Sequence, residues 1–253
     1  MGRTFLNNEG LRKLVRIREK VLDFFYPKFC LVCDKEGVYL CPECFSKIKT
    51  FPAPFCPYCQ SRSFDGKVCK NCPPAGEAGR KSIYGFITAT SYKEKDVRKL
   101  IDTFKYSFIK ELANPLAFLI FKFLKENPEI EFFKNPLDFV ILPIPLHSRR
   151  LRWRGFNQAE EIGKELVPLL KIPMKTNILF RRRYTEPQVE LGIKERKENV
   201  KEAFKVSSLE KIKNKKIILL DDVATTLSTL EEAAKVLKKS GVKRVWALTV
   251  AKG

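Results

Sequence analysis

The chain has 253 residues, 44% of them hydrophobic, and its 49 Lys and Arg outnumber 29 Asp and Glu to give a net charge of +20. A chain of this length and apolar content can bury a real core, which excludes an intrinsically disordered protein and predicts one large domain with at most a small appendage. The basic excess is typical of a protein that binds a polyanion such as a nucleic acid or a phosphorylated ligand. It is equally typical of the Lys-rich surface of a heat-adapted protein.

The first 26 residues are expected to form a helix, without an export signal or a membrane span. Residues 8–25 place apolar side chains at helical spacing between Arg and Lys residues, and the pattern ends before Pro27. The segment lacks the apolar run and small-residue cleavage site of an export signal. The longest apolar run, Phe139–Leu146, is too short to cross a bilayer. We therefore expect a soluble, cytoplasmic protein.

All eight cysteines lie in four C-x-x-C pairs, within an expected module at residues 27–75. A tight turn at this spacing directs two thiolates to one tetrahedral ion, so two pairs complete a four-cysteine zinc site. The pattern predicts two structural zinc sites in a small double zinc ribbon, with metal supplying folding energy that a short segment cannot gain from burial. Pairing in chain order is simplest, whereas a cross-braced pairing, disulfides or an iron–sulfur cluster remain alternatives. The expected ligands are Cys30, Cys33, Cys41, Cys44, Cys56, Cys59, Cys69 and Cys72.

Residues 80–253, which follow a Pro-rich linker, alternate between strand and helix patterns. This alternation predicts an α/β domain with a mostly parallel sheet covered by helices. Ligands of such sheets bind beyond the carboxyl ends of the strands, where loops lead into helices. Strands are expected at 83–92, 139–142, 176–180, 215–220 and 242–250, and helices at 94–104, 112–125, 158–167 and 229–239.

The loop after the strand at 215–220 is the most informative. Asp221 and Asp222 follow the strand, and a loop rich in hydroxyl groups then leads into the next helix. Free N–H groups at a helix start bind anions, and paired carboxylates suit sugar hydroxyls or a divalent cation. The combination predicts a ribose-phosphate site, although a plain helix start after a strand-end Asp pair is the alternative. The expected binding residues are Asp221, Asp222, Ala224, Thr225, Thr226, Leu227, Ser228 and Thr229.

This loop resembles the phosphoribosyl pyrophosphate (PRPP) signature of type I phosphoribosyltransferases, in which two acidic residues precede a Thr-Thr-Gly-x-Thr loop. The whole chain resembles the competence protein F (ComF) family, which joins a double zinc ribbon to a type I phosphoribosyltransferase fold. The resemblance is carried by residues 23–33, 92–106 and 142–158 and by Arg182 or Arg183, Thr185, Gln188, Arg196, Asn199 and Phe204.

The resemblance implies roles for the site residues. Asp221 and Asp222 would hold the ribose hydroxyls, and residues 225–229 the 5′-phosphate. Pyrophosphate and Mg²⁺ would lie by the loop after residue 142, with Arg149, Arg152 and Arg154 as candidates, and residues 181–199 would form a mobile hood. Leu227 departs from the family, which has Gly at this place. A left-handed Leu costs about 1 kcal/mol or more, so either the loop takes another path or PRPP affinity is weakened.

Two segments interleave Arg with aromatic residues. Arg pairs with phosphates while aromatic rings stack on exposed bases, a combination that predicts binding of single-stranded DNA. Alternatively, Trp153 and Phe156 fill the core and the Arg residues bind only pyrophosphate. His147, the only histidine, is expected to be structural. The nucleic-acid candidates are Arg149, Arg150, Arg152, Trp153, Arg154, Arg181, Arg182 and Arg183.

The resemblance, taken with these features, implies a ComF-like competence factor for natural transformation that binds PRPP or a related ribose phosphate, single-stranded DNA and other DNA-uptake proteins. The alternative is an active phosphoribosyltransferase of nucleotide metabolism or salvage without a DNA role. A third hypothesis, a zinc-ribbon transcription regulator, has weaker support, because no DNA-reading helix stands out in the sequence. If active, the protein would displace pyrophosphate at C1′ of PRPP without a covalent nucleophile. The sequence names neither the acceptor nor the oligomeric state.

Overall fold

The computed structural model describes residues 27–72, 82–184, 200–207, 210 and 212–253. The chain divides into two compact units, Met1–Ile48 and Lys49–Gly253. The helix expected at 8–25, the linker after residue 72 and most of the expected hood lie outside the described residues, and the three-part domain division stays a prediction. None of the helices in the described ranges is long and apolar enough to cross a membrane.

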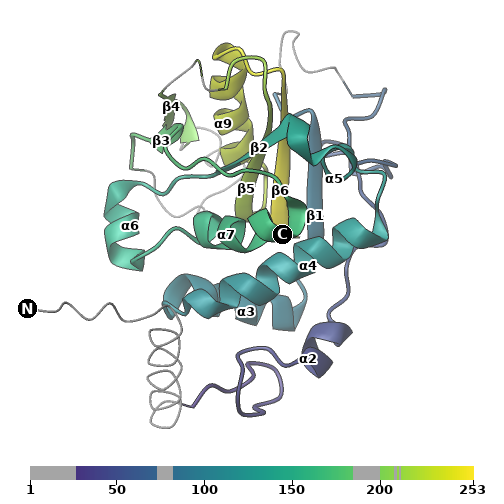
Figure 1. Ribbon diagram of the computed structural model, residues 1–253, viewed down its shortest axis with the longest axis vertical. Coiled ribbons are helices and arrows are strands. Elements are labelled where there is room, and N and C mark those ends of the chain that lie inside the picture. Colours follow the sequence, from purple (N-terminus) through teal and green to yellow (C-terminus); the bar gives the residue numbers. More distant parts are fainter. Residues whose placement is uncertain (1–26, 73–81, 185–199, 208–209, 211) are drawn as a thin grey trace, which may run out of the picture. The chain divides into compact units, whose positions relative to one another are not determined.

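A four-stranded parallel sheet forms the centre of the larger unit (Figure 1). Its two central strands, β5 and β6, are buried over most of their length, because helices cover both faces of the sheet. This burial explains their nearly continuous apolar sequences. The prediction of a mostly parallel sheet covered by helices is confirmed. In spatial order the strands are β1 (Gly85–Ser91), β6 (Arg244–Lys252), β5 (Lys216–Ala224) and β2 (Phe139–Pro143).

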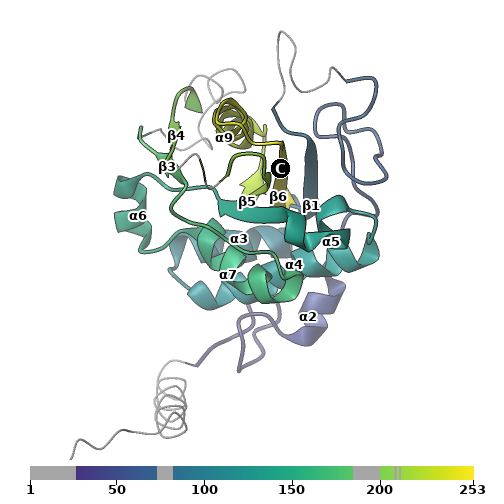
Figure 2. The ribbon, with the colours of Figure 1, turned by 45° about the horizontal axis from the view of Figure 1, so that its top comes forward.

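Helices from different parts of the chain cover the two faces (Figure 2). On one face, α4 (Ala113–Glu126) packs on β1 and β6, and its neighbour α7 (Gln158–Leu170) packs on β5 and β2. On the other face, α9 (Ser228–Lys239) packs on β5 and β6. The remaining helices are α2 (Pro42–Lys47) in the smaller unit and, in the larger one, α3 (Lys95–Tyr106), η1 (Lys110–Leu112), α5 (Glu131–Lys134), η2 (Pro136–Asp138) and α6 (Ser148–Arg154).

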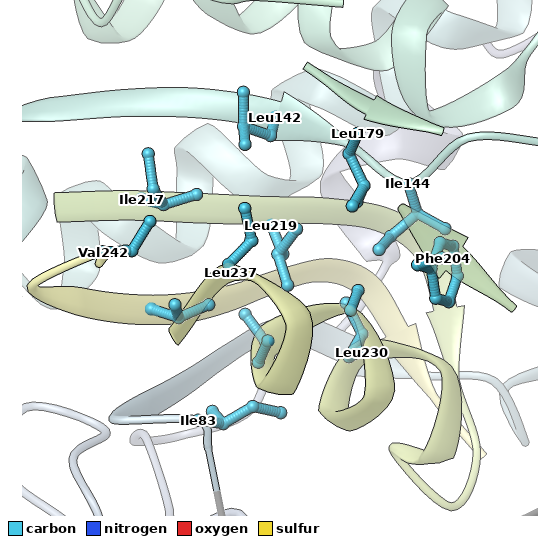
Figure 3. Close-up of a cluster of buried hydrophobic side chains, with 14 of the residues drawn as sticks. Ile83, Leu142, Ile144, Leu179, Phe204, Ile217, Leu219, Leu230, Leu237 and Val242 are labelled. Carbon is cyan, nitrogen blue, oxygen red and sulfur yellow. The ribbon is translucent and has the colours of Figure 1, made fainter. Parts of the chain in front are cut away.

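The face beneath α9 is filled by apolar side chains from several elements (Figure 3). Leu219 of β5 and Leu230 of α9 meet there with Leu179 and Phe204, which come from an antiparallel hairpin. The hairpin strands are β3 (Leu179–Arg181) and β4 (Phe204–Val206), so the strand expected at 176–180 is three residues long and lies outside the parallel sheet. Ile178 and Leu179 pack in the core under α9, whereas Phe180 is exposed, and this packing positions Arg181.

Two further boundaries differ from expectation at the carboxyl edge of the sheet. Strand β5 continues through Asp221 and Asp222 to Ala224, because its extension pairs with β6. Residues 148–154 form helix α6, where no helix was predicted. His147 lies at its N-cap, where Nδ1 accepts a hydrogen bond from the backbone N–H of Arg149 at 3.3 Å, a structural role as expected.

Candidate functional site

The eight cysteines form two clusters of four, and the Sγ atoms of each cluster lie within 4.8 Å of one another. The first cluster holds the first two C-x-x-C pairs, and the second holds the last two. This is the pairing in chain order, so the cross-braced alternative is excluded. The first cluster is Cys30, Cys33, Cys41 and Cys44, and the second is Cys56, Cys59, Cys69 and Cys72.

The geometry of both clusters fits a tetrahedral zinc ion. Bonds of about 2.3 Å from a central ion place its ligands about 3.8 Å apart. The Sγ atoms of Cys33 and Cys41 are 3.7 Å apart, and those of Cys56 and Cys72 are 3.8 Å apart. The backbone N–H of Cys41 also donates to Cys30 Sγ at 3.4 Å. Donors of this kind stabilise thiolates, and no disulfide joins the eight thiols.

A cavity of about 720 Å³ opens at the carboxyl edge of the parallel sheet. Tyr92 follows β1 and Ile144 follows β2, and both line it together with the end of β5. Residues from α3, α6, the start of α7 and the β3 hairpin complete the walls. Parallel strands end at one edge, so side chains far apart in the sequence meet there.

Asp221 and Asp222 lie side by side in this cavity. Asp222 is buried, and its Oδ1 is 3.2 Å from Nζ of Lys105 on α3. Burial and the charge of Asp222 raise the pKa of Asp221 to about 7, although Lys105 and Arg181 oppose that rise. Asp221 therefore changes its charge near neutral pH, and a ligand that donates hydrogen bonds or brings a cation would favour its ionised form.

The loop between β5 and α9 keeps the backbone conformation that glycine favours. Leu227 is left-handed, with φ +61°, and its side chain is 8% exposed because it packs in the core beneath α9. It does not line the large cavity, which Thr225 and Thr229 do line. With Ser228 and Thr225 it instead borders a hollow of about 20 Å³ inside the loop. The Leu227 side chain cannot cap α9, so the first N–H groups of this helix can donate hydrogen bonds to an anion.

Arginines form another part of the cavity wall. Arg149, Arg150 and Arg154 of α6 and Arg181 of β3 line the cavity. The guanidinium groups of Arg149 and Arg150 lie 5.0 and 5.8 Å from the ring centroid of Tyr184. Burial and the charges of Arg150 and Arg183 lower the pKa of Arg181 to about 10, although Asp221 opposes that fall.

The structure brings together some expected site residues and not others. Of those expected to bind nucleic acid, Trp153 also lines the cavity, whereas Arg152, Arg182 and Arg183 are exposed and do not. Of those in the expected phosphate loop, Ala224, Leu227 and Ser228 line only the small hollow, and Thr226 lines neither cavity.

Two cavity residues at the start of α7 lie in the segment that resembles the family but were not predicted to bind a ligand. Asn157 caps this helix, with its Oδ1 accepting the N–H of Ala159 at 3.1 Å. Gln158 Oε1 accepts a hydrogen bond from Arg154 Nη1 at 3.2 Å. Their position at the start of a predicted helix, after a strand, could have indicated them, because ligands of α/β sheets bind at such places.

The fold and the cysteine clusters define a protein of the phosphoribosyltransferase fold that also carries a zinc-ribbon module. A double zinc ribbon domain model matches residues 21–73, and a phosphoribosyl transferase domain model matches residues 155–253. The chain belongs to the competence protein F family. It is 32% identical over 213 residues to Competence protein F of Haemophilus influenzae, an alignment that covers 83% of this chain and 89% of that protein.

Other relatives extend over a similar share of the chain. Competence protein ComFC of Bacillus subtilis is 28% identical over 84% of this chain and 89% of its own length. The DNA utilization protein YhgH of Salmonella typhi is 28% identical over 87% of this chain and 88% of its own length. Among solved structures, the AQ2163 protein of Aquifex aeolicus covers 66% of this chain and 86% of its own at 13% identity, but its TM-score of 0.37 is too low to carry an argument.

Proposed function

We propose that this protein is a cytoplasmic competence factor that binds PRPP or a related ribose phosphate with Mg²⁺ and contacts single-stranded DNA during natural transformation. The observation that carries the proposal is one cavity that joins a carboxylate pair, Thr225 and Thr229 at the start of α9, and a wall of arginines. PRPP carries the complementary groups, namely ribose hydroxyls, a 5′-phosphate and a pyrophosphate. The names of the relatives, competence proteins and DNA utilization proteins, support the DNA role.

In this proposal each wall of the cavity binds one part of the ligand. Asp221 and Asp222 accept hydrogen bonds from the ribose hydroxyls. The first N–H groups of α9 and the hydroxyls of Thr225 and Thr229 bind the 5′-phosphate. Arg149 and Arg154, which line the cavity, hold the pyrophosphate, and Mg²⁺ would neutralise part of its charge. The two cysteine clusters bind structural zinc, because the arrangement of their Sγ atoms fits that ion.

Calorimetric titration of the zinc-loaded full chain with PRPP and Mg²⁺ tests the ribose-phosphate site. We expect binding, and we expect Asp221→Asn to weaken it about tenfold or more, because hydrogen bonds to a charged group are lost. Asp138→Asn is the matched control, since Asp138 lies before β2 at the opposite edge of the sheet. The proposal fails if the wild-type protein does not bind PRPP. If the Leu227→Gly variant then binds PRPP, Leu227 is the residue that prevents binding.

Titration with single-stranded DNA tests the second half of the proposal. We expect an affinity that falls steeply as salt rises, because arginines displace counterions from phosphates. The double variant Arg152→Ala/Arg154→Ala should lose DNA binding, whereas Asp221→Ala/Asp222→Ala should keep it. A flat affinity between low and moderate salt would contradict the DNA role.

A second candidate is transferase activity on PRPP without a DNA role. The carboxylate pair and the arginines that line one cavity suit a transferase equally well, because they could hold the ribose and the departing pyrophosphate. Measuring PRPP turnover with a panel of bases and with ammonia separates the candidates. Turnover by a protein that does not bind single-stranded DNA would establish the enzyme of nucleotide metabolism instead.

A further inference from the structure

Three aromatic side chains stand exposed beside the ribose-phosphate cavity. Trp153 of α6 is 59% exposed, Phe108 is 52% exposed, and Tyr106 at the end of α3 is 50% exposed. Tyr106 and Trp153 also line the cavity, so the group begins at its wall and continues outward. We call these three residues the aromatic shelf. Large rings gathered in water are unfavourable for a protein with no ligand for them, so such patches mark binding sites.

Trp153 is the centre of the shelf. Its ring centroid lies 6.1 Å from that of Tyr106 and 6.3 Å from that of Phe108, in edge-to-face pairs inclined at 61° and 69°. Phe108 has a left-handed backbone with φ +60°, which is unfavourable for a bulky residue. The turn after α3 therefore holds this ring at the shelf at some conformational cost, as is common in binding sites.

Arg154 connects the shelf to the cavity. Its guanidinium group lies 5.5 Å from the Tyr106 ring centroid and 6.0 Å from that of Trp153. Its Nη1 also donates to Gln158, which is only 2% exposed. Arg154 Nε and Gln158 Nε2 are buried without a hydrogen-bond partner among the residues that the structure describes. Because both residues line the cavity, a ligand oxygen there would satisfy donors that are otherwise costly to bury.

The charges around the shelf indicate which ligand it takes. Arg149 and Arg152 are exposed on the same short helix as Trp153, and the chain as a whole carries a net charge of +20. A lone mononucleotide would need one ring and a few cations, and a duplex keeps its base faces covered. Several rings beside several arginines suit a single strand, which offers unpaired bases and a row of phosphates together.

We propose that Tyr106, Phe108 and Trp153 stack unpaired bases of single-stranded DNA whose phosphates lie along the arginines of α6. This inference rests on the proposed function and deepens it, because it adds the end of α3 and the turn after it to the DNA surface. Arg154 contacts the shelf and lines the cavity, so the proposed DNA surface begins at the wall of the ribose-phosphate site.

Titration of the full zinc-loaded chain with a short oligothymidylate tests the shelf by two readouts. Trp153 is exposed and Trp246 is fully buried, and they are the only tryptophans, so stacking should quench the exposed fluorophore alone. Anisotropy of a labelled oligonucleotide gives the affinity. Tyr106→Ala and Phe108→Ala should each weaken binding about tenfold or more, while Tyr106→Phe should retain it, because only a ring is needed. Phe64→Ala is the matched control, since this ring is 77% exposed and lies two residues before Gly66, which bonds to Phe86 at the amino end of β1, away from the carboxyl edge with the cavity.

The salt dependence separates rings from charges. The aromatic variants should lose affinity without changing the slope of log affinity against log salt, whereas Arg152→Ala should reduce that slope by about 0.7. If wild-type protein binds no oligothymidylate, the DNA half of the proposed function fails. If it binds, but Tyr106→Ala and Phe108→Ala bind as tightly as Phe64→Ala, the shelf is wrong while the proposed function stands.

Discussion

The two cysteine clusters share one local structure and differ in their surroundings. An offset of 26 residues relates the first C-x-x-C pair, here called the first knuckle, of each cluster. Cys30 and Cys33 thus correspond to Cys56 and Cys59. The residue after each second cysteine is left-handed, with φ +57° at Asp34 and +61° at Gln60, and its N–H donates to the first cysteine's carbonyl at 2.9 and 3.0 Å. The first C-x-x-C pair of each cluster therefore folds into the same turn, which directs its two thiolates to one ion.

The surroundings of the first cluster are small and local. Cys30, Cys41 and Cys44 pack only with the half-buried Val32 and Leu40 among the described residues, and they belong to the smaller unit. The described part of this segment therefore buries little apolar surface. We expect bound metal to supply much of its folding free energy.

The second cluster is built into the larger unit. Phe55 and Tyr58 pack against the core beneath α9, and the Tyr58 hydroxyl donates to Glu231 Oε2 at 2.9 Å. The carbonyl of Gly66 accepts the N–H of Phe86 on β1 at 2.9 Å, in a contact so close that a Cβ on Gly66 would collide with β1. The same cysteine motif thus has two kinds of surroundings: the first cluster packs locally, and the second packs against the core of the larger unit.

Removing the metal ligands of each cluster in turn is the strongest test of this difference between the clusters. Cys56→Ser/Cys72→Ser should lower the melting temperature of the sheet unit by about 10 °C or more, since a site worth several kcal/mol is coupled to its core. Cys30→Ser/Cys44→Ser should leave that temperature within about 2 °C, because its cluster belongs to a separate unit. The buried Trp246 on β6 reports the melting by fluorescence in a Trp153→Phe background. Equal losses from the two double variants would refute the distinction.

The next largest effect is expected at two phenylalanines in equivalent positions, each directly before the first knuckle of its cluster. Phe55 is half-buried against Phe86, with ring centroids 5.9 Å apart, whereas Phe29 is exposed. Phe55→Ala should destabilise the sheet unit by about 2 kcal/mol, or roughly 6 °C, and Phe29→Ala should not change it. Thermal melting of zinc-loaded protein measures both. A Phe55→Ala protein that melts like wild type would mean that this ring does not couple the cluster to the sheet.

A smaller effect isolates the hydrogen bond between the second cluster and α9. Tyr58→Phe removes the hydroxyl that donates a hydrogen bond to Glu231. It should lower the free energy of unfolding by about 1 kcal/mol, and the melting temperature by roughly 3 °C, because a partly buried carboxylate loses a donor. Tyr39→Phe makes the same chemical change in the smaller unit and should not alter melting of the sheet unit. If both variants melt alike, packing alone joins the second cluster to α9.

The sequence predicted features whose cause is local. Four C-x-x-C pairs are enough to predict two tetrahedral sites, since each turn directs its own thiolates. The apolar run before Asp221 predicted a buried parallel strand with an acidic pair at its carboxyl end. Both features follow from neighbouring residues, without knowledge of what packs on them.

Features that depend on distant partners were missed. Nothing in the two knuckles shows that Tyr58 meets Glu231, 173 residues away, so the sequence could not tell which cluster belongs to the larger unit. Helix α6 has no buried residue and hence no apolar periodicity to reveal it. Trp153 was recognised, but Tyr106 at the end of α3 and Phe108 in the turn after it lie more than 40 residues earlier, and only the folded chain brings them to Trp153.

Asp221 makes the stability of the sheet unit depend on pH. Loss of the first cluster should not change this dependence. Because burial raises the pKa of Asp221 in the folded state to about 7, ionisation opposes folding at pH 8, and stability is regained as the pH falls through about 7. Asp221→Asn should therefore be more stable than wild type at pH 8, by a margin that shrinks at pH 6. Urea unfolding at both values measures this margin. It should be the same in a Cys30→Ser/Cys44→Ser background, and a changed margin would show that the first cluster does influence the carboxylate pair.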